Sequence, residues 1–212
     1  MIANLITLIR IIMTFFVVGL LNRNFYLNIA MFVTIIVIIM MDWFDGLIAR
    51  KYEETSKFGA LFDIAGDRIV ENIFWMYFAA IGLISVWVPI IVVSRGFLTD
   101  LLRTMAFSKG KTPFGEKTMM ESGWAKVLVS SHASRGIYAG LKVAAFCYLA
   151  GLLVIKSAIT EFGISPPMNL LTLIGQILVY VVVVMCVIRG FPVIWDGRKY
   201  LLEGLNEKSS DI

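Results

Sequence analysis

The sequence contains few charged residues for its length. Only 16% of the 212 residues are Asp, Glu, Lys or Arg, while 59% are hydrophobic. Soluble domains average about 25% charged and about 45–50% apolar residues. Because so little charge cannot cover the surface of a water-soluble protein, most of that surface must face lipid. The composition therefore predicts an integral membrane protein.

Cysteine and histidine are also scarce, with two cysteines and one histidine. Cys147 and Cys186 both fall in apolar runs, which argues against a disulfide framework and favours small packing residues. The net charge of +4 does not require nucleic acid as a partner, because basic residues beside a membrane attract anionic lipid headgroups.

Long hydrophobic runs dominate what remains. A membrane-crossing helix needs roughly 20 mostly apolar residues, and six runs meet this need. They lie at residues 5–22, 27–48, 64–82, 84–106, 138–158 and 168–189. We therefore expect an all-α integral membrane protein with six transmembrane helices. These would form a single domain over residues 1–200, followed by a polar C-terminal tail at 201–212.

The basic residues indicate how these helices are oriented. Three of them lie between the second and third runs, seven lie from Arg103 to Lys142, and four lie at or after the end of the sixth run. Positively charged connections stay on the cytoplasmic side of a membrane. Both termini and the aspartate-rich segment that follows the second run are therefore expected to face the cytoplasm, in the cell membrane.

Four aspartates are placed at regular spacings beside apolar runs. Asp42 and Asp45 are three residues apart, and Asp63 and Asp67 are four apart at the expected start of the third helix, so each pair shares a helix face. Four adjacent carboxylates cannot all stay ionised at a bilayer edge without cations. Oxygen ligands suit Mg²⁺, Mn²⁺ or Ca²⁺, and two such ions form a clamp for phosphate chemistry. Salt bridges to neighbouring bases explain any single aspartate, but not four at these spacings.

These aspartates belong to a longer motif, which reads Asp42-x2-Asp45-Gly46-x2-Ala49-Arg50-x8-Gly59-x3-Asp63-x3-Asp67. At every fixed position and in both gap lengths, the motif resembles the signature of the CDP-alcohol phosphatidyltransferase family. The resemblance implies a six-helix membrane enzyme, usually a homodimer. Such an enzyme joins a CDP-linked lipid to an alcohol and releases CMP.

The resemblance also implies a role for each residue of the motif. The four aspartates would hold two divalent ions, Mg²⁺ or Mn²⁺, and Asp67 would also act as the general base. The nucleotide of the CDP-linked lipid would lie against the remaining motif residues, Gly46, Ala49, Arg50 and Gly59. Small residues leave room for a close ligand, and an arginine binds phosphate through two parallel hydrogen bonds.

The acceptor alcohol is less well defined. Residues 4–10 (NLITLIR) and 94–111 resemble bacterial phosphatidylglycerophosphate synthases, but Gly96 stands where these enzymes usually have Glu. Residues 134–142 (SRGIYAGLK) likewise lack their usual Gly-Lys-x-Lys-Thr run. A phosphorylated acceptor needs a basic pocket, and the candidates are Arg103, Lys111, Arg135 and Lys142. Anchoring at the membrane surface is their alternative role. We expect glycerol 3-phosphate as the acceptor, with inositol phosphate or another polar alcohol as the alternative.

Two other classes of protein explain part of the sequence. A metal or solute transporter with an acidic site would place its ligands near the bilayer midplane, often in an inverted repeat. Here the aspartates lie at the ends of apolar runs, and no repeat is visible. A scaffold that binds anionic lipid explains the basic residues but not the four aspartates. The enzyme is therefore the favoured hypothesis.

Overall fold

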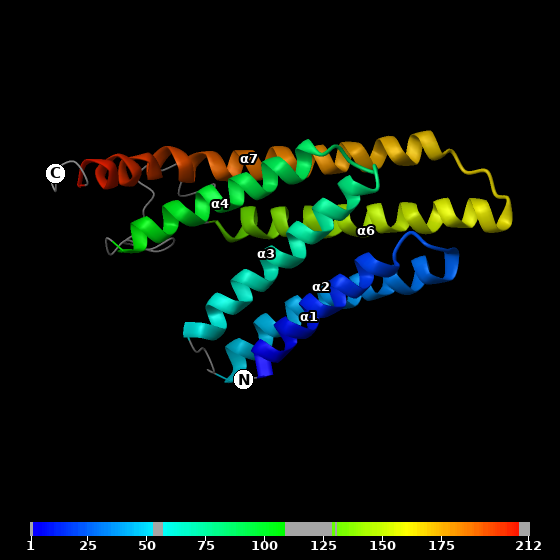
Figure 1. The fold of residues 1–212 in the computed structure, drawn as a ribbon, viewed down its shortest axis with the longest axis horizontal. Coiled ribbons are helices and arrows are strands. Elements are labelled where there is room, and N and C mark those ends of the chain that lie inside the picture. The colour runs from blue at the N-terminus through cyan, green and yellow to red at the C-terminus, as the bar shows by residue number, and fades with distance from the viewer. Residues whose placement is uncertain (1, 53–56, 109–128, 130, 208–212) are drawn as a thin grey trace. The chain divides into compact units, whose positions relative to one another are not determined.

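Helices account for nearly all of the residues that the computed structural model describes, namely 2–52, 57–108, 129 and 131–207. Figure 1 shows their arrangement. In chain order they are α1 (Ile2–Leu20), α2 (Phe25–Tyr52), α3 (Lys57–Ala80), α4 (Trp87–Ser108), α6 (His132–Phe162) and α7 (Met168–Glu207). Over these residues the all-α prediction is confirmed.

Three of the described helices are long and apolar enough to cross a membrane. The qualifying segments are Phe25–Asp42 in α2, Ala133–Phe162 in α6 and Met168–Lys199 in α7, and α1 holds a shorter apolar stretch at Asn4–Leu20. Length and composition thus agree with a multi-pass membrane protein. Six membrane crossings with both termini in the cytoplasm remain a prediction.

Several helices extend beyond the apolar runs. α2 continues to Tyr52, and α3 begins at Lys57, so Asp63 and Asp67 are its seventh and eleventh residues. The expectation that these two aspartates start the helix was wrong. α7 likewise continues past residue 189 to Glu207. A hydropathy pattern marks the apolar part of a helix, whereas Lys, Arg and Glu at its ends are good helix formers and prolong it.

The chain divides into two compact units. Unit 1 comprises Met1–Pro89 and Val143–Leu178, and unit 2 comprises Ile90–Lys142 and Val179–Ile212. α4, α6 and α7 each contribute residues to both. The predicted division into a domain over residues 1–200 and a tail over 201–212 stays a prediction.

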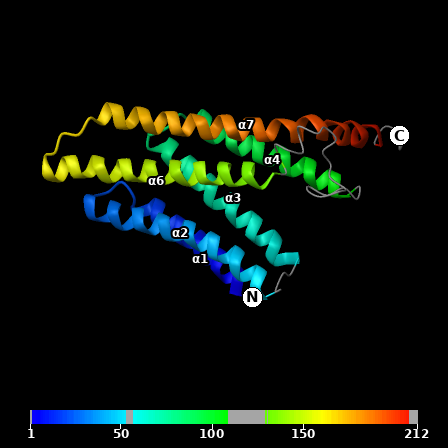
Figure 2. The ribbon, with the colours of Figure 1, turned by 180° about the vertical axis from the view of Figure 1, so that it is seen from behind.

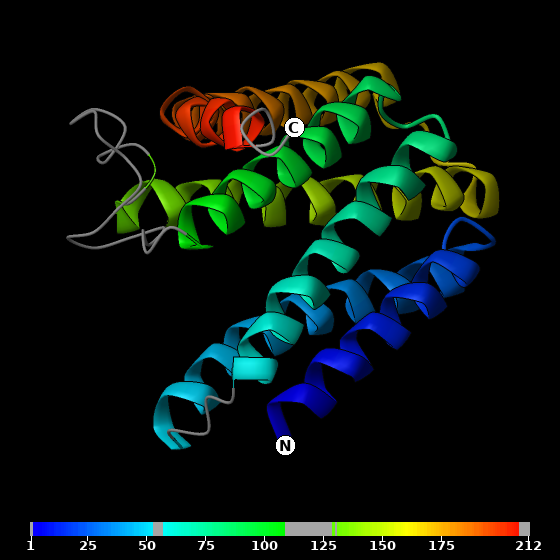
Figure 3. The ribbon, with the colours of Figure 1, turned by 60° about the vertical axis from the view of Figure 1, so that its left-hand side comes forward.

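In unit 1, a short turn folds α2 back along α1, as Figure 2 shows. Asn22 adopts a left-handed φ of 69°, and its N–H donates to Asn28 Oδ1 at 2.7 Å. Asn24 caps α2, because its Oδ1 accepts the Leu27 N–H at 2.9 Å. α1 also packs against α3 (Figure 3). The first helix therefore contacts both helices that carry the aspartate motif.

An aromatic cluster joins α3 to α6 within unit 1. The Phe146 ring centroid lies 4.6 Å from that of Trp75 and 5.4 Å from that of Phe74, and all three side chains are buried. Aromatic rings contribute large buried areas to a core. This packing fixes the half of α3 that follows the aspartates.

In unit 2, α4 packs against α7, and two glycines of α7 make the close approach possible. A Cβ at Gly190 would lie 2.6 Å from Arg95 Cγ, and one at Gly197 would lie 3.0 Å from Leu102 Cδ1. Leu102 also belongs to a buried cluster with Ala106, Val129 and Val193. The glycines therefore bring the Arg95 side chain against the backbone of α7.

Candidate functional site

Three of the four motif aspartates meet in unit 1. Asp42 of α2 and Asp63 and Asp67 of α3 each offer a carboxylate oxygen, and these oxygens lie within 4.8 Å of one another. Asp42 and Asp67 are about half exposed, at 53% and 49%. The expectation that the two helices bring their carboxylates together is confirmed for these three residues.

The first helix places a positive charge among these carboxylates. Arg10 Nη1 donates to Asp42 Oδ1, and Nη2 donates to Asp67 Oδ1. The Arg10 side chain is only 2% exposed. One turn earlier, the Thr7 hydroxyl hydrogen-bonds the Asp63 carboxylate. A single face of α1 thus contacts all three carboxylates, a role that the sequence analysis did not assign to Arg10 or Thr7.

Burial raises the pKa of Asp63 above its ordinary value of 3.8. The Arg10 charge opposes this rise, the Asp42 charge adds to it, and the Thr7 hydrogen bond opposes it. Removal from water and a neighbouring anion both disfavour the charged carboxylate. Any cation bound among these oxygens would therefore favour the ionised form.

The described carboxylates fit a divalent metal. Hard ions such as Mg²⁺ and Mn²⁺ prefer oxygen ligands, and Mg²⁺ is commonly held by one or two carboxylates together with water and substrate phosphate. Three carboxylates are gathered here, and they already attract the guanidinium of Arg10 as a cation. The donor set and its affinity for positive charge both match such an ion.

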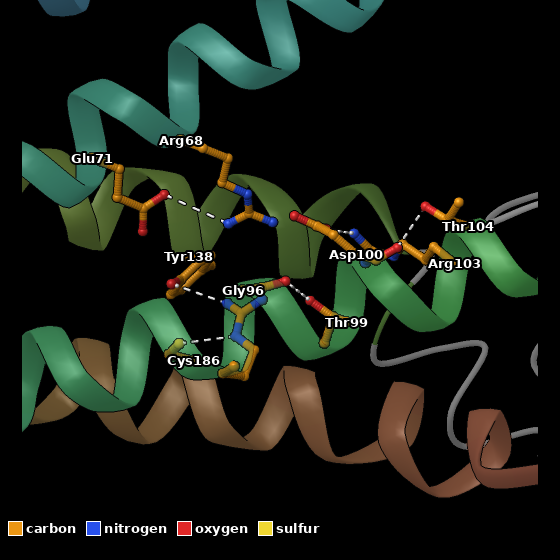
Figure 4. Close-up of polar contacts among 10 residues, drawn as sticks. Arg68, Glu71, Gly96, Thr99, Asp100, Arg103, Thr104, Tyr138 and Cys186 are labelled. Atoms are coloured by element: carbon orange, nitrogen blue, oxygen red, sulfur yellow. Dashed lines mark hydrogen bonds and ion pairs between the residues drawn. The ribbon is translucent and has the colours of Figure 1, made fainter. Parts of the chain in front are cut away.

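The remaining motif residues are less fully described. Asp45, Gly46, Ala49 and Arg50 fall within α2, but their side chains lie outside the described residues, while Gly59 lies in the first turn of α3. One turn after Asp67, Glu71 is buried, and its Oε2 lies 4.0 Å from Arg68 Nη1 (Figure 4). Glu71 therefore continues the row of carboxylates on α3.

A second polar group surrounds Tyr138 in unit 2. The Tyr138 ring centroid lies 5.0 Å from Lys142 Nζ, 5.5 Å from Arg189 Cζ and 5.7 Å from Arg95 Cζ. All three positions suit cation–π attraction. Arg95 also donates to the Tyr138 hydroxyl at 3.3 Å and to Cys186 Sγ at 3.1 Å (Figure 4). Helices α4, α6 and α7 each place one positively charged side chain at this tyrosine.

Arg135 completes what we call the basic cluster, which consists of Arg95, Lys142 and Arg189 at the Tyr138 ring and of Arg135, whose charge acts on Arg189. The charges of Arg95 and Arg135 both act on Arg189, and Arg189 Nη1 donates to Ser134 Oγ at 2.7 Å. Neighbouring like charges repel each other, and a bound anion relieves that repulsion. Phosphate suits such a site, because guanidinium groups bind it through two parallel hydrogen bonds.

The other two acceptor candidates, Arg103 and Lys111, are not among the contacts described for this cluster. Arg103 Nη1 is 3.5 Å from Asp100 Oδ1, one turn earlier on α4 (Figure 4), and Lys111 lies outside the described residues. The basic cluster thus includes Arg135 and Lys142 from the predicted set and adds Arg95 and Arg189. Arg189 ends the sixth apolar run, where its charge indicated only orientation. Its spacing from Arg135 along the chain carried no further signal.

The described residues form helices, three of them long and apolar enough to cross a membrane, and gather three carboxylates that could hold a metal ion. The profile of the CDP-alcohol phosphatidyltransferase family matches residues 1–188. The chain therefore belongs to the CDP-alcohol phosphatidyltransferase family, an enzyme family that uses a divalent metal. This membership favours the enzyme hypothesis over the transporter and the scaffold.

Curated relatives resemble part of the chain. The CDP-diacylglycerol–glycerol-3-phosphate 3-phosphatidyltransferase of Haemophilus influenzae is 30% identical over 133 residues, which cover 56% of this chain and 63% of that protein. The enzyme of the same name from Wigglesworthia glossinidia brevipalpis is 34% identical, over 50% of this chain and 60% of its own length. The one from Bacillus subtilis is 26% identical, over 42% of this chain and 47% of its own length. The matches thus span less than two thirds of each of these relatives.

Proposed function

We propose that this protein transfers the phosphatidyl group of a CDP-linked lipid, CDP-diacylglycerol or an ether analogue, to a phosphorylated alcohol and releases CMP. The observation that carries the proposal is the meeting of Asp42, Asp63 and Asp67 on two helices that α1 holds together. Together with Asp45, these residues would hold two divalent ions, Mg²⁺ or Mn²⁺. When bound, the ions would neutralise the diphosphate and the charge that develops on the departing CMP.

The protein's own residues would orient both substrates. Gly46, Ala49 and Gly59 would leave room for the nucleotide, and Arg50 would pair with its phosphates. Asp67 would accept the proton of the acceptor hydroxyl while the hydroxyl oxygen attacks the phosphorus that carries the lipid. The bond from that phosphorus to CMP breaks, and CMP leaves with the electron pair. Its half-exposed position leaves Asp67 open to an incoming alcohol.

The acceptor is proposed to be glycerol 3-phosphate. Arg135 and Lys142 would bind its phosphate, and the additions to the basic cluster, Arg95 and Arg189, would strengthen that binding. The names of the relatives point to the same acceptor for those proteins. Arg103 and Lys111 would border the same side of the membrane. Inositol phosphate carries the same recognisable phosphate and is the alternative.

The proposal places six transmembrane helices in the cell membrane with the aspartates facing the cytoplasm, and a homodimer as the working form. One substrate is then a membrane lipid and the other dissolves in water, which explains why carboxylates lie where apolar helices end. Contacts with surrounding lipid suit side chains such as Phe15 and Phe16, which are 61% and 58% exposed.

One assay tests the proposal. Protein purified in detergent is given CDP-diacylglycerol, Mg²⁺ and one of a panel of labelled acceptors, and CMP release is measured. We expect release with glycerol 3-phosphate that exceeds release with inositol phosphate, free glycerol and serine. Absence of CMP release with every acceptor would refute the transferase, and preference for an acceptor without phosphate would refute only the acceptor.

A further inference from the structure

Arg10 is an unusual residue for its helix. α1 has no acidic residue in its 19 positions, and Arg10 is its only charged side chain. Its buried face is formed by Thr7, Arg10, Thr14 and Val17, at the three- and four-residue spacings of one helix side. A charge buried in an apolar helix is costly unless it is paired. Arg10 must therefore be explained by its partners.

Those partners are the carboxylates expected to bind metal. The guanidinium donates hydrogen bonds from Nη1 to Asp42 and from Nη2 to Asp67, and so joins α1 to α2 and α3 at one point. Both bonds go to the Oδ1 atoms of residues that belong to the three-carboxylate group. A divalent ion bound there would meet the positive charge of Arg10 at close range. The ion and the guanidinium therefore compete for the same two carboxylates.

The Arg10 guanidinium is not fully hydrogen-bonded in this position. Its third donor, Nε, is buried and has no acceptor among the described groups. An unsatisfied buried donor makes this arrangement less favourable than a fully bonded one. Asp42 and Asp67 are about half exposed, so an ion reaches them from solvent while α1 stays packed.

We propose that Arg10 is a tethered counter-cation, which neutralises Asp42 and Asp67 while the metal is absent and is displaced when the metal binds. This inference rests on the metal dependence in the proposed function. Arg10 is then a positioning residue that keeps the two aspartates together before loading. The same contact lowers the apparent affinity for metal, because metal binding must break the two charged hydrogen bonds that Arg10 makes to Asp42 and Asp67.

The test is a titration of the full-length protein with Mn²⁺ in detergent, without any lipid or acceptor, by calorimetry. Arg10→Gln removes the competing charge, and we expect the Mn²⁺ Kd to fall about tenfold. In EDTA, the same variant should melt at a lower temperature than wild type, since Asp42 and Asp67 then repel without compensation. The rise in melting temperature on adding Mn²⁺ should be larger for the variant, because tighter binding stabilises more.

Two further variants make the result decisive. Arg10→Lys keeps one charge but loses the fork that spans two carboxylates, so its Mn²⁺ Kd should fall between those of wild type and Arg10→Gln. This variant preserves the test if Arg10→Gln fails to fold. Arg23→Gln removes the same charge from an exposed side chain and should leave the Mn²⁺ Kd unchanged.

The outcomes separate this inference from the function beneath it. If wild type binds Mn²⁺ and the Arg10 variants bind it equally or more weakly, the counter-cation is refuted and metal dependence stands. If wild type binds no Mn²⁺ at all, the metal centre and the counter-cation both fail. Tighter binding by the Arg10 variants, with Arg23→Gln unchanged, supports the displacement.

Discussion

Thr7 of α1 and Gly66 of α3 meet so closely that a Cβ at position 66 would lie 2.3 Å from Thr7 Cγ2. Gly66 stands between Asp63 and Asp67, and Thr7 stands one turn before Arg10. This contact therefore sets the distance at which the first helix reaches the carboxylates. Substitutions at this contact should therefore change the stability of the protein, whatever reaction it catalyses.

Gly66→Ala should destabilise the protein by about 1–3 kcal/mol, because the added methyl group overpacks the α1–α3 contact. Thr7→Ser removes the methyl group that clashes, so the double variant should recover much of the loss in thermal melting. Gly140→Ala is the control, since an added Cβ there meets nothing within 4 Å. Equal melting temperatures for Gly66→Ala and Gly140→Ala would contradict the contact.

Loss of a metal ligand should abolish the reaction. Asp63→Asn keeps the shape of the side chain but removes its charge, and we expect CMP release to fall by more than about 100-fold. EDTA should have the same effect on wild type, with recovery on adding Mg²⁺. The exposed Glu161 provides the control, as Glu161→Gln should be active. Full turnover in excess EDTA would rule out metal dependence.

Asp67 should be separable from the other ligands by its effect on turnover. General-base assistance contributes about 10²–10⁴-fold, so Asp67→Asn should lose this factor in kcat while CDP-diacylglycerol still binds. Binding can be followed by calorimetry with the lipid in mixed micelles. If nucleotide binding is lost together with turnover, Asp67 is chiefly a metal ligand and the base lies elsewhere.

The stability of the metal-free protein should depend on pH through Asp63. Its pKa is raised in the folded protein, so the folded state holds this proton more tightly than the unfolded state does. The resulting stabilisation is complete below the ordinary value of 3.8 and is lost as pH rises through the raised pKa. Asp63→Asn cannot ionise. In EDTA, the melting temperature of Asp63→Asn minus that of wild type should therefore increase as pH rises. For Glu161→Gln this difference should stay constant.

The basic cluster should govern the acceptor rather than the lipid. A hydrogen bond to a charged group contributes about 1.5–3 kcal/mol, so Arg135→Gln should raise the KM for glycerol 3-phosphate roughly 10- to 150-fold. The KM for CDP-diacylglycerol should barely change. Arg135→Lys should recover only part of the loss, because a point charge cannot form two parallel bonds.

Two comparisons make the acceptor experiment specific. Arg189→Gln should behave like Arg135→Gln, since its guanidinium faces the same Tyr138 ring. Lys156→Gln alters an exposed base elsewhere on α6 and should be neutral. If Arg135→Gln and Lys156→Gln leave the acceptor KM equally unaffected, the basic cluster serves as a membrane-side anchor.

Much of the aspartate site was predictable, because helix periodicity is a local property. Spacings of three and four residues indicated that each pair shares a helix face, and the short connection between α2 and α3 brought Asp42 to Asp63 and Asp67. The helix ends were not predictable in the same way. Apolar runs indicate where lipid contact is expected, whereas α3 begins at Lys57, six residues before Asp63.

Contacts between residues far apart in the sequence could not be predicted from local sequence patterns. Arg10 lies far along the chain from Asp42 and Asp67, and nothing in the spacing of these residues indicates that they meet. Its place between Thr7 and Thr14 on one face of an apolar helix was the available signal. The basic cluster is similar, since Arg95 and Arg189 meet at Tyr138 only because Gly190 lets α4 approach α7.

The pairing of Arg10 also bears on how the chain is made. Arg10 is synthesised 32 residues before Asp42 and 57 residues before Asp67. The proposed topology makes α1 a membrane-crossing helix, in which an unpaired arginine costs up to about 2.5–3.5 kcal/mol during insertion, so α1 alone would be poorly suited to enter lipid until Asp42 has followed it. The hairpin of α1 and α2 is then the smallest piece of nascent chain in which this charge is matched. Insertion of the first helix is thereby tied to the arrival of the carboxylates.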